Sequence, residues 1–314
     1  MKFNISKEWL LKRAHLEEGL EIGAGGPIES LTSSRMIDWS WFPIKEMYKR
    51  NWFEGYTGSL SAATAEAEAL VTSFMECAIR KPLVALQRQR VRTGSKANPY
   101  ALLAWQCRVL LIAKSSLPRA PFKHSNLNEE WLYSLVQLSR FKEGPLRAKE
   151  HLSNAGIAMV VEPHLTSTHL DGAALLGDDC PVVGLTLRND RVDNFWFVLL
   201  HEIIHIKKHL KKGGVEDIFD ECIAEGTDVA LSEIEREADE LAGQALIPDQ
   251  SWNSCLARFV RSKESVVSFA TKLGISPAIV AGRIRYEAGN WTLLRDLVGQ
   301  GEVRKLFPKV TFGE

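Results

Sequence analysis

The chain has 314 residues, of which 45% are hydrophobic and 25% charged, and its 39 basic residues balance 39 acidic ones. This length and composition are sufficient for a globular protein of two or more domains, and zero net charge gives no argument for binding nucleic acid or an anionic membrane. The N-terminus has no signal-peptide apolar core, and the longest apolar run, residues 195–200, is too short to span a bilayer. Five cysteines without a Cys-x-x-Cys spacing indicate reduced thiols, so we expect a cytoplasmic protein.

Residues 1–144 are predicted to form a mostly helical N-terminal domain. Apolar residues recur at helical spacing over 99–114 and 128–141, and an Ala- and Glu-rich stretch over 62–80 follows Ser61, which can cap it. Residues 80–96 hold six basic side chains and no acid, a pattern that we interpret as a solvated helix face rather than a site for nucleic acid or an acidic partner.

Residues 145–250 are predicted to form a second domain with a small sheet. A helix over 145–154 should end at Gly156, and strands are expected over 157–162 and 182–188. The helix that follows the second strand has Asp193 or Asn194 available as its N-cap. Farther on, a short strand is expected over 215–222.

The most informative motif, His201-Glu202-Ile-Ile-His205, lies in this helix within an apolar run. On a helix, His201 and His205 lie one turn apart on the same face, where two imidazoles can bind one Zn²⁺. Glu202 would lie beside the metal, where a carboxylate can take a proton from water. The alternative is a pair of satisfied core histidines, but the apolar helical flanks favour a metal site. His209, four residues after His205, is interpreted as a structural or surface residue.

A helix over 232–247 offers candidates for a further ligand, because a catalytic zinc usually takes three protein ligands and leaves one position open. A stripe of small apolar residues at spacings of three and four runs along this helix: Ala238, Leu241, Ala242 and Ala245. Glu235 and Asp239 lie on the same stripe, whereas Glu233 and Glu237 lie about 200° from Glu235 around the helix and should face solvent. We therefore predict Glu235 as the third ligand and Asp239 as the acceptor of a hydrogen bond from a ligating histidine. The alternative is an ordinary charged helix face.

Residues 251–314 are predicted to form a helical C-terminal region with a helix-turn-helix-like unit over 264–287. A Gly-Ile-Ser turn separates two helices, and Pro277 starts the second. DNA-reading helices usually place base-contacting side chains at their start, whereas here the start is apolar and Arg283 and Arg285 come late. We therefore expect this unit to pack against the protein rather than to bind DNA directly.

Two motifs together resemble those of a known family. The His-Glu-x-x-His motif and the later Glu-x-x-Ala-Asp-x-x-Ala motif, followed by Leu-Ile-Pro, are similar to the motifs of the ImmA/IrrE metallopeptidases, which resemble thermolysin-like gluzincins at the metal site. The resemblance covers roughly residues 145–290. It implies one Zn²⁺ per chain and five site residues: His201, His205 and Glu235 as ligands, Glu202 as the catalytic carboxylate, and Asp239 as the support of a ligating histidine. It also implies that the strand over 182–188 is an edge strand that holds an extended peptide by main-chain hydrogen bonds.

These observations predict an α+β, mainly helical fold, with a helical N-terminal region, a gluzincin-like zinc peptidase core that has a small β-sheet and an active-site helix, and a helical C-terminal region. The predicted function is a zinc-dependent metalloendopeptidase. The resemblance implies a repressor, antitoxin or other regulatory protein as substrate, in a phage, stress or toxin–antitoxin setting. A second electrophile for the reaction is expected among four residues: His164, His169, Arg188 and Tyr286.

Many relatives carry a repressor-like helix-turn-helix at the N-terminus, as in HigA-type fusions, whereas this sequence begins at the segment that follows it. We therefore expect a helix-turn-helix regulator or a toxin–antitoxin component to be a separate partner chain, with no membrane association. The alternative function is a non-proteolytic toxin–antitoxin or transcription-regulatory binding module with a structural or vestigial zinc site.

Overall fold

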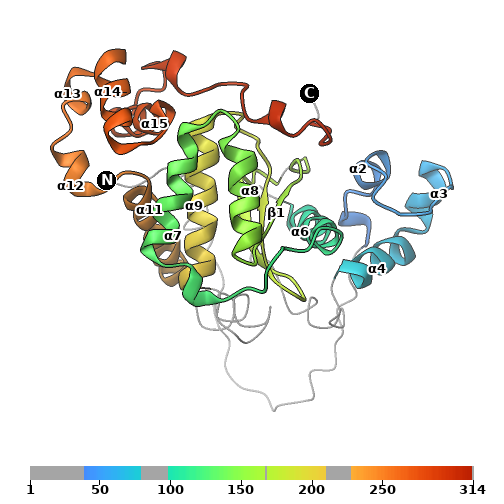
Figure 1. Ribbon diagram of the computed structural model, residues 1–314. Coiled ribbons are helices and arrows are strands. Elements are labelled where there is room, and N and C mark those ends of the chain that lie inside the picture. The colour runs from blue at the N-terminus through green and yellow to red at the C-terminus, as the bar shows by residue number, and fades with distance from the viewer. Residues whose placement is uncertain (1–38, 79–97, 167, 210–227, 313–314) are drawn as a thin grey trace, which may run out of the picture.

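A computed structural model describes residues 39–78, 98–166, 168–209 and 228–312. Helices surround a small sheet in these residues, which confirms the predicted α+β, mainly helical fold class (Figure 1). The α-helices are α2 (Ile44–Lys49), α3 (Leu60–Ala65), α4 (Ala67–Ala78), α6 (Pro99–Lys114), α7 (Glu129–Gln137), α8 (Gly144–Asn154), α9 (Val192–Lys208), α11 (Asp228–Leu246), α12 (Asp249–Asn253), α13 (Ala257–Val260), α14 (Lys263–Leu273) and α15 (Pro277–Ala288). Short 3-10 turns are η1 (Trp39–Trp41), η2 (His124–Asn126), η3 (Leu138–Arg140), η4 (Arg295–Leu297) and η5 (Arg304–Leu306). The strand predicted over 215–222 and the basic stretch 80–96 lie outside the described residues.

The sheet corrects one prediction about the strand before the active-site helix. Its strands are β1 (Ala158–Val161), β2 (Gly172–Leu176) and β3 (Pro181–Leu185), and their order is β1-β3-β2. β3 pairs in parallel with β1 and antiparallel with β2. It is therefore the central strand, so the prediction that it forms a substrate-binding edge is wrong. The edge on that side is β2, which the sequence analysis did not predict.

Side chains alternate along each strand, so the two faces of the sheet contribute to two different hydrophobic cores, and both faces are covered. Met159 and Val183 belong to the core that also contains the inner faces of α8 and α9. Val160 and Val182 belong to a second core, on the other face, formed with α6 and the N-terminal helices. Figure 1 shows this order of layers, with the sheet lying between α8 and α9 on one side and α6 on the other.

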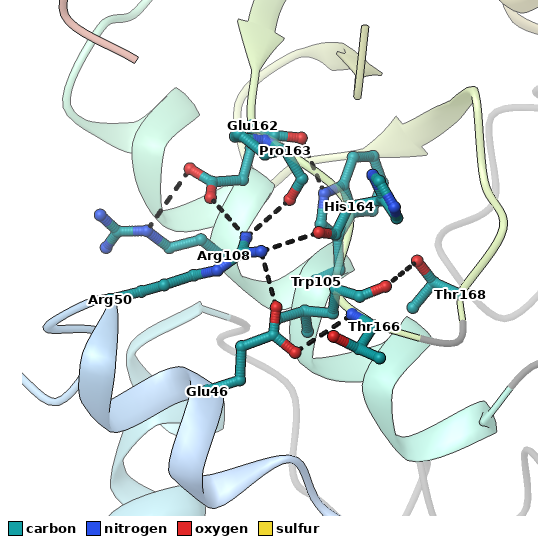
Figure 2. A network of polar contacts seen from close by, with 10 residues as sticks. Glu46, Arg50, Trp105, Arg108, Glu162, Pro163, His164, Thr166 and Thr168 are labelled. Carbon is teal, nitrogen blue, oxygen red and sulfur yellow. Dashed lines mark hydrogen bonds and ion pairs between the residues drawn. The ribbon is translucent and has the colours of Figure 1, made fainter. Parts of the chain in front are cut away.

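A polar network joins the N-terminal helices to the loop that leads from β1 to β2 (Figure 2). The guanidinium of Arg50, the C-cap residue of α2, donates to the carbonyl oxygens of Pro163 and His164, each at 2.8 Å. Glu46 pairs with Arg50 at 2.6 Å and accepts a hydrogen bond from the Thr166 backbone N–H at 3.1 Å. These contacts hold the backbone of the loop against α2, so α2 helps to fix the chain that enters the edge strand.

The helix starts show where local sequence signals were misread. Ser59, not Ser61, caps α3 by accepting a hydrogen bond from the Ala62 N–H at 3.2 Å, and a break at residue 66 separates α3 from α4. The predicted cap of α9 is also wrong, because the helix begins at Val192, after Arg191, without a side-chain cap. Asp193 lies inside the first turn, where its buried carboxylate accepts a hydrogen bond from Arg191 Nε at 2.9 Å.

The C-terminal helix-turn-helix unit forms as predicted from α14, a left-handed Gly274 with φ +69°, and α15. The start of α15 is buried, since its residues 278–281 are inside the core, and the helix packs against α9. Arg283 donates to the Ile247 carbonyl at 2.9 Å and stacks over Trp252. Arg285 is buried and donates to the Trp291 carbonyl. The unit is thus part of the packing around the active-site helix. None of the helices in the described residues is long and apolar enough to cross a membrane.

Candidate metal centre

Helix α9 places His201 and His205 on one face, toward α11. Their spacing of four residues brings the two Nε2 atoms to 2.9 Å from each other. Each side chain is 15% exposed, so the imidazoles line a partly closed site rather than the protein surface. The opposite face of α9 is apolar and lies in the core, which fixes the orientation of the histidine face.

Helix α11 adds a carboxylate to this pair, because it packs against α9 through the predicted stripe of small residues, in which Ala238 and Ala242 are fully buried. Glu235 Oε2 lies 3.4 Å from His201 Nε2, and Glu235 Oε1 lies 3.5 Å from His205 Nε2. Ligand atoms about 2.05 Å from a tetrahedral zinc ion stand about 3.3 Å apart. The two distances to Glu235 match this spacing and the 2.9 Å between the imidazoles is slightly shorter, so the three donors are placed and have the chemistry to hold such an ion.

Asp239 supports His201 from the side away from these donors. The His201 Nδ1–H donates to Asp239 Oδ1 at 2.9 Å, which leaves Nε2 directed toward Glu235 and His205. Burial opposes the charged form of His201, but its hydrogen bonds to Asp239 and Glu235 outweigh burial and raise its pKa to about 10. Burial and the charge on His201 lower the pKa of His205 to about 4. The pair thus carries one positive charge, which a bound cation would replace.

Glu202 lies about 100° around α9 from His201 and points toward the edge strand β2. It is 6% exposed, and its carboxylate accepts a hydrogen bond from the Ala174 backbone N–H. Burial raises the pKa of Glu202 to about 7, against the opposing charge of His201. A carboxyl group with this pKa exchanges a proton readily near neutral pH, as a general base and acid must.

The geometry therefore brings together the five residues predicted for the metal site, which all lie on α9 and α11. Residues 169–285 match the family model of the IrrE N-terminal-like domain, a peptidase family. This match supports the predicted resemblance to the ImmA/IrrE peptidases over that part of the chain. The matched range includes β2, α9, α11 and the C-terminal unit through most of α15. No curated protein and no solved structure matches the chain.

The peptidase domain contains one contact that the sequence analysis did not predict. His209 Nδ1 lies 3.0 Å from His205 Nδ1, and His209 Nε2 lies 3.3 Å from Glu237 Oε2. Glu237 is half exposed, as expected from its place on α11, but it reaches the end of α9. The only signal in the sequence was the four-residue spacing from His205 to His209, which puts both on one helix face.

Two of the four candidates for the second electrophile lie within electrostatic reach of the peptidase site. Arg188 pairs with Asp171 at 3.1 Å, and the Asp171 charge contributes to the raised pKa of Glu202. Burial and the charges of Asp239 and Glu287 raise the pKa of Tyr286 to about 12, so its hydroxyl stays protonated and can donate a hydrogen bond. For the other two, His169 is exposed, and burial and the charge of Arg188 lower the pKa of His164, whose backbone carbonyl accepts a hydrogen bond from Arg50.

Proposed function

We propose that this chain is a zinc-dependent metalloendopeptidase with one Zn²⁺ held by His201, His205 and Glu235. The observation that carries the proposal is the convergence of these three donors, whose ligand atoms all lie within 4.8 Å of one another. The family of the matched domain is a zinc-dependent peptidase family, which supports the choice of metal. Three protein ligands leave a fourth position for water or substrate, the arrangement of catalytic rather than structural zinc sites.

When bound, zinc would polarise the scissile carbonyl and lower the pKa of water to roughly 7. Glu202 acts as the general base that takes a proton from the attacking water, and then as the acid that protonates the leaving amine. Its burial and its closeness to His201 and Glu235 support both roles. The Ala174 N–H holds the carboxylate in place, so that the proton is exchanged from a fixed position.

In this proposal the edge strand β2 binds an extended peptide. The alternation of its hydrogen bonds to β3 indicates which of its main-chain N–H and C=O groups remain available to pair with the peptide. At one end of the ladder, the Asp171 carbonyl accepts a hydrogen bond from the Thr186 N–H. At the other end, the Gly177 N–H donates to the Cys180 carbonyl. Both distances are 3.0 Å. Since bonded and non-bonded pairs alternate in an antiparallel ladder, odd-numbered residues of β2 bond to β3 and even-numbered residues turn away. Ala174 follows this rule, because its N–H donates to Glu202 instead.

We place an extended substrate along Gly172, Ala174 and Leu176 by β-augmentation, with the Ala174 N–H kept by Glu202 and the other outward main-chain groups left for the peptide. A peptide paired there runs past the Glu202 carboxylate. The site thus favours a substrate with an unfolded or loop segment, because a folded helix cannot offer free main-chain groups. Within that class we propose a repressor, an antitoxin or another regulatory protein, supplied as a separate chain; this choice rests on the family resemblance.

Proteolysis can be tested without knowing the substrate. Cells that express the wild type, Glu202→Gln or the exposed control Glu233→Gln, together with the product of the neighbouring gene, are compared for new protein N-termini by mass spectrometry. We expect the same new N-termini with the wild type and Glu233→Gln, and none with Glu202→Gln. If Glu202→Gln retains the full biological effect, the chain acts through binding and the peptidase proposal is wrong.

A further inference from the structure

The clearest polar contacts that the proposed mechanism does not use lie behind His205, at the end of α9. His205 Nε2 faces the other two donors, so its Nδ1 points away from the metal position and toward His209 Nδ1, 3.0 Å away. The His209 side chain is 16% exposed, and its backbone N–H bonds to the His205 carbonyl at 2.8 Å. The contact is therefore made by a largely buried ring at a position fixed by the last turn of the helix.

The protonation states in this chain of contacts follow from the metal-binding role of His205. A neutral imidazole that binds a metal through Nε2 carries its proton on Nδ1. This proton can only be donated, so His209 Nδ1 must accept it and His209 must carry its own proton on Nε2. Glu237 Oε2, 3.3 Å from His209 Nε2, is an acceptor for that proton. Every nitrogen in the chain then has one role, and no two donors face each other.

We propose that His209 is a positioning residue, which holds His205 in the orientation and tautomer that bind zinc, and that Glu237 in turn orients His209. The proposal rests on the zinc-dependent function proposed above. It gives His205 a support equivalent to the one that Asp239 gives His201, where the Nδ1–Oδ1 distance is 2.9 Å. The two supports differ in origin, because Asp239 lies on α11 whereas His209 is the C-cap residue of α9. Partners of this kind typically change metal affinity about 10- to 100-fold when they are removed.

The test compares His209→Asn with His209→Leu. The two replacements have nearly the same shape, and the Asn side-chain oxygen takes the place of Nδ1 as an acceptor for His205, whereas Leu offers none. Zinc affinity is measured by competition with a chromophoric chelator, and the melting temperature of each metal-free variant is measured alongside it. We expect His209→Leu to bind zinc about 10- to 100-fold more weakly than the wild type. His209→Asn should stay within about threefold, because the acceptor is kept.

Glu237→Gln should lie close to the wild type and Glu237→Ala between the wild type and His209→Leu, since Gln still accepts from Nε2–H and the Glu237 side chain is half exposed. Equal zinc affinity in His209→Leu and His209→Asn would overturn the positioning role. An equal loss of affinity in both, matched by an equal loss of melting temperature, would show a packing role instead and would also overturn it. A wild type that binds no zinc would refute the proposed function itself, a result distinct from either of these.

Discussion

Gly172 leaves the space that the Glu202 carboxylate occupies beside β2. A Cβ at this position would lie 2.7 Å from Val198 Cγ1 and 3.0 Å from Glu202 Oε1. Ordinary contacts begin at 3.4 Å, so Gly172→Ala must push Glu202 Oε1 back by about 0.4 Å. A displacement of about 1 Å at a catalytic group can lower a rate about 100-fold, so we expect turnover to fall about tenfold.

Gly184→Ala is the matched control for this substitution. Its Cβ would lie 2.8 Å from Trp105 Cη2 and 3.0 Å from Val109 Cγ1, on the face of the sheet that packs against α6. Overpacking of this kind costs about 1–3 kcal/mol in either variant. Each kcal/mol lowers the melting temperature of a protein of this size by roughly 2–4 °C. The two variants should therefore lose similar stability, and only Gly172→Ala should also displace the proposed catalytic carboxylate.

The assay uses a peptide that spans the cleavage site identified by coexpression. Initial rates are measured below both melting temperatures, with zinc content determined on the same samples. We expect Gly184→Ala to turn over near the wild-type rate and Gly172→Ala about tenfold more slowly at equal zinc content. Equal rates for the two variants would refute the close approach of Glu202 to β2 as a constraint on catalysis.

Three further predictions concern the edge strand, a buried histidine and the α2 network. Ala173→Pro removes a hydrogen bond to β3 and should destabilise the fold by about 1–3 kcal/mol. Ala174→Pro removes the outward N–H that bonds to Glu202 and should mainly lower turnover. The reverse pattern would contradict this strand register. Burial lowers the pKa of His151, so the unfolded chain binds the proton first and stability is lost as the pH falls through about 6.5. His151→Gln should flatten the decrease in melting temperature between about pH 7.5 and pH 5.5, and an unchanged slope would count against it. Arg50→Ala should accelerate hydrogen exchange in the loop after β1, unlike the exposed control Lys49→Ala; equal exchange would show that the network does not hold this loop.

The helices that carry the site could be predicted because their signals are local. The spacing of His201 and His205 fixes their common face on any α-helix, whatever surrounds it. Glu235 could be chosen over Glu233 because the small-residue stripe on α11 marks the side that packs closely, and Ala238 is indeed fully buried there. Both inferences need only the 3.6-residue period.

The elements that were missed or misplaced depend on contacts between distant segments. β2 reads Gly-Ala-Ala-Leu-Leu, which has neither alternation nor β-branched residues, and it is a strand because it pairs with β3 and packs against α9. Whether β3 lies at an edge or in the centre is decided by that same pairing. The contact of His209 with Glu237 likewise joins two helices, so the helical period alone gave only half of it.

Zinc stoichiometry in wild type, Glu235→Ala and Glu233→Ala is the most direct test of the central claim. Glu235 and Glu233 lie on the same helix two residues apart, but only Glu235 approaches the histidine pair, at 3.4 and 3.5 Å. Inductively coupled plasma mass spectrometry should find about one zinc per chain in the wild type and Glu233→Ala, as a three-ligand site demands. Glu235→Ala should lose most of its zinc on dialysis against a weak chelator. A folded, stable wild type without zinc, or a Glu235→Ala variant that retains zinc as well as Glu233→Ala does, would contradict the account.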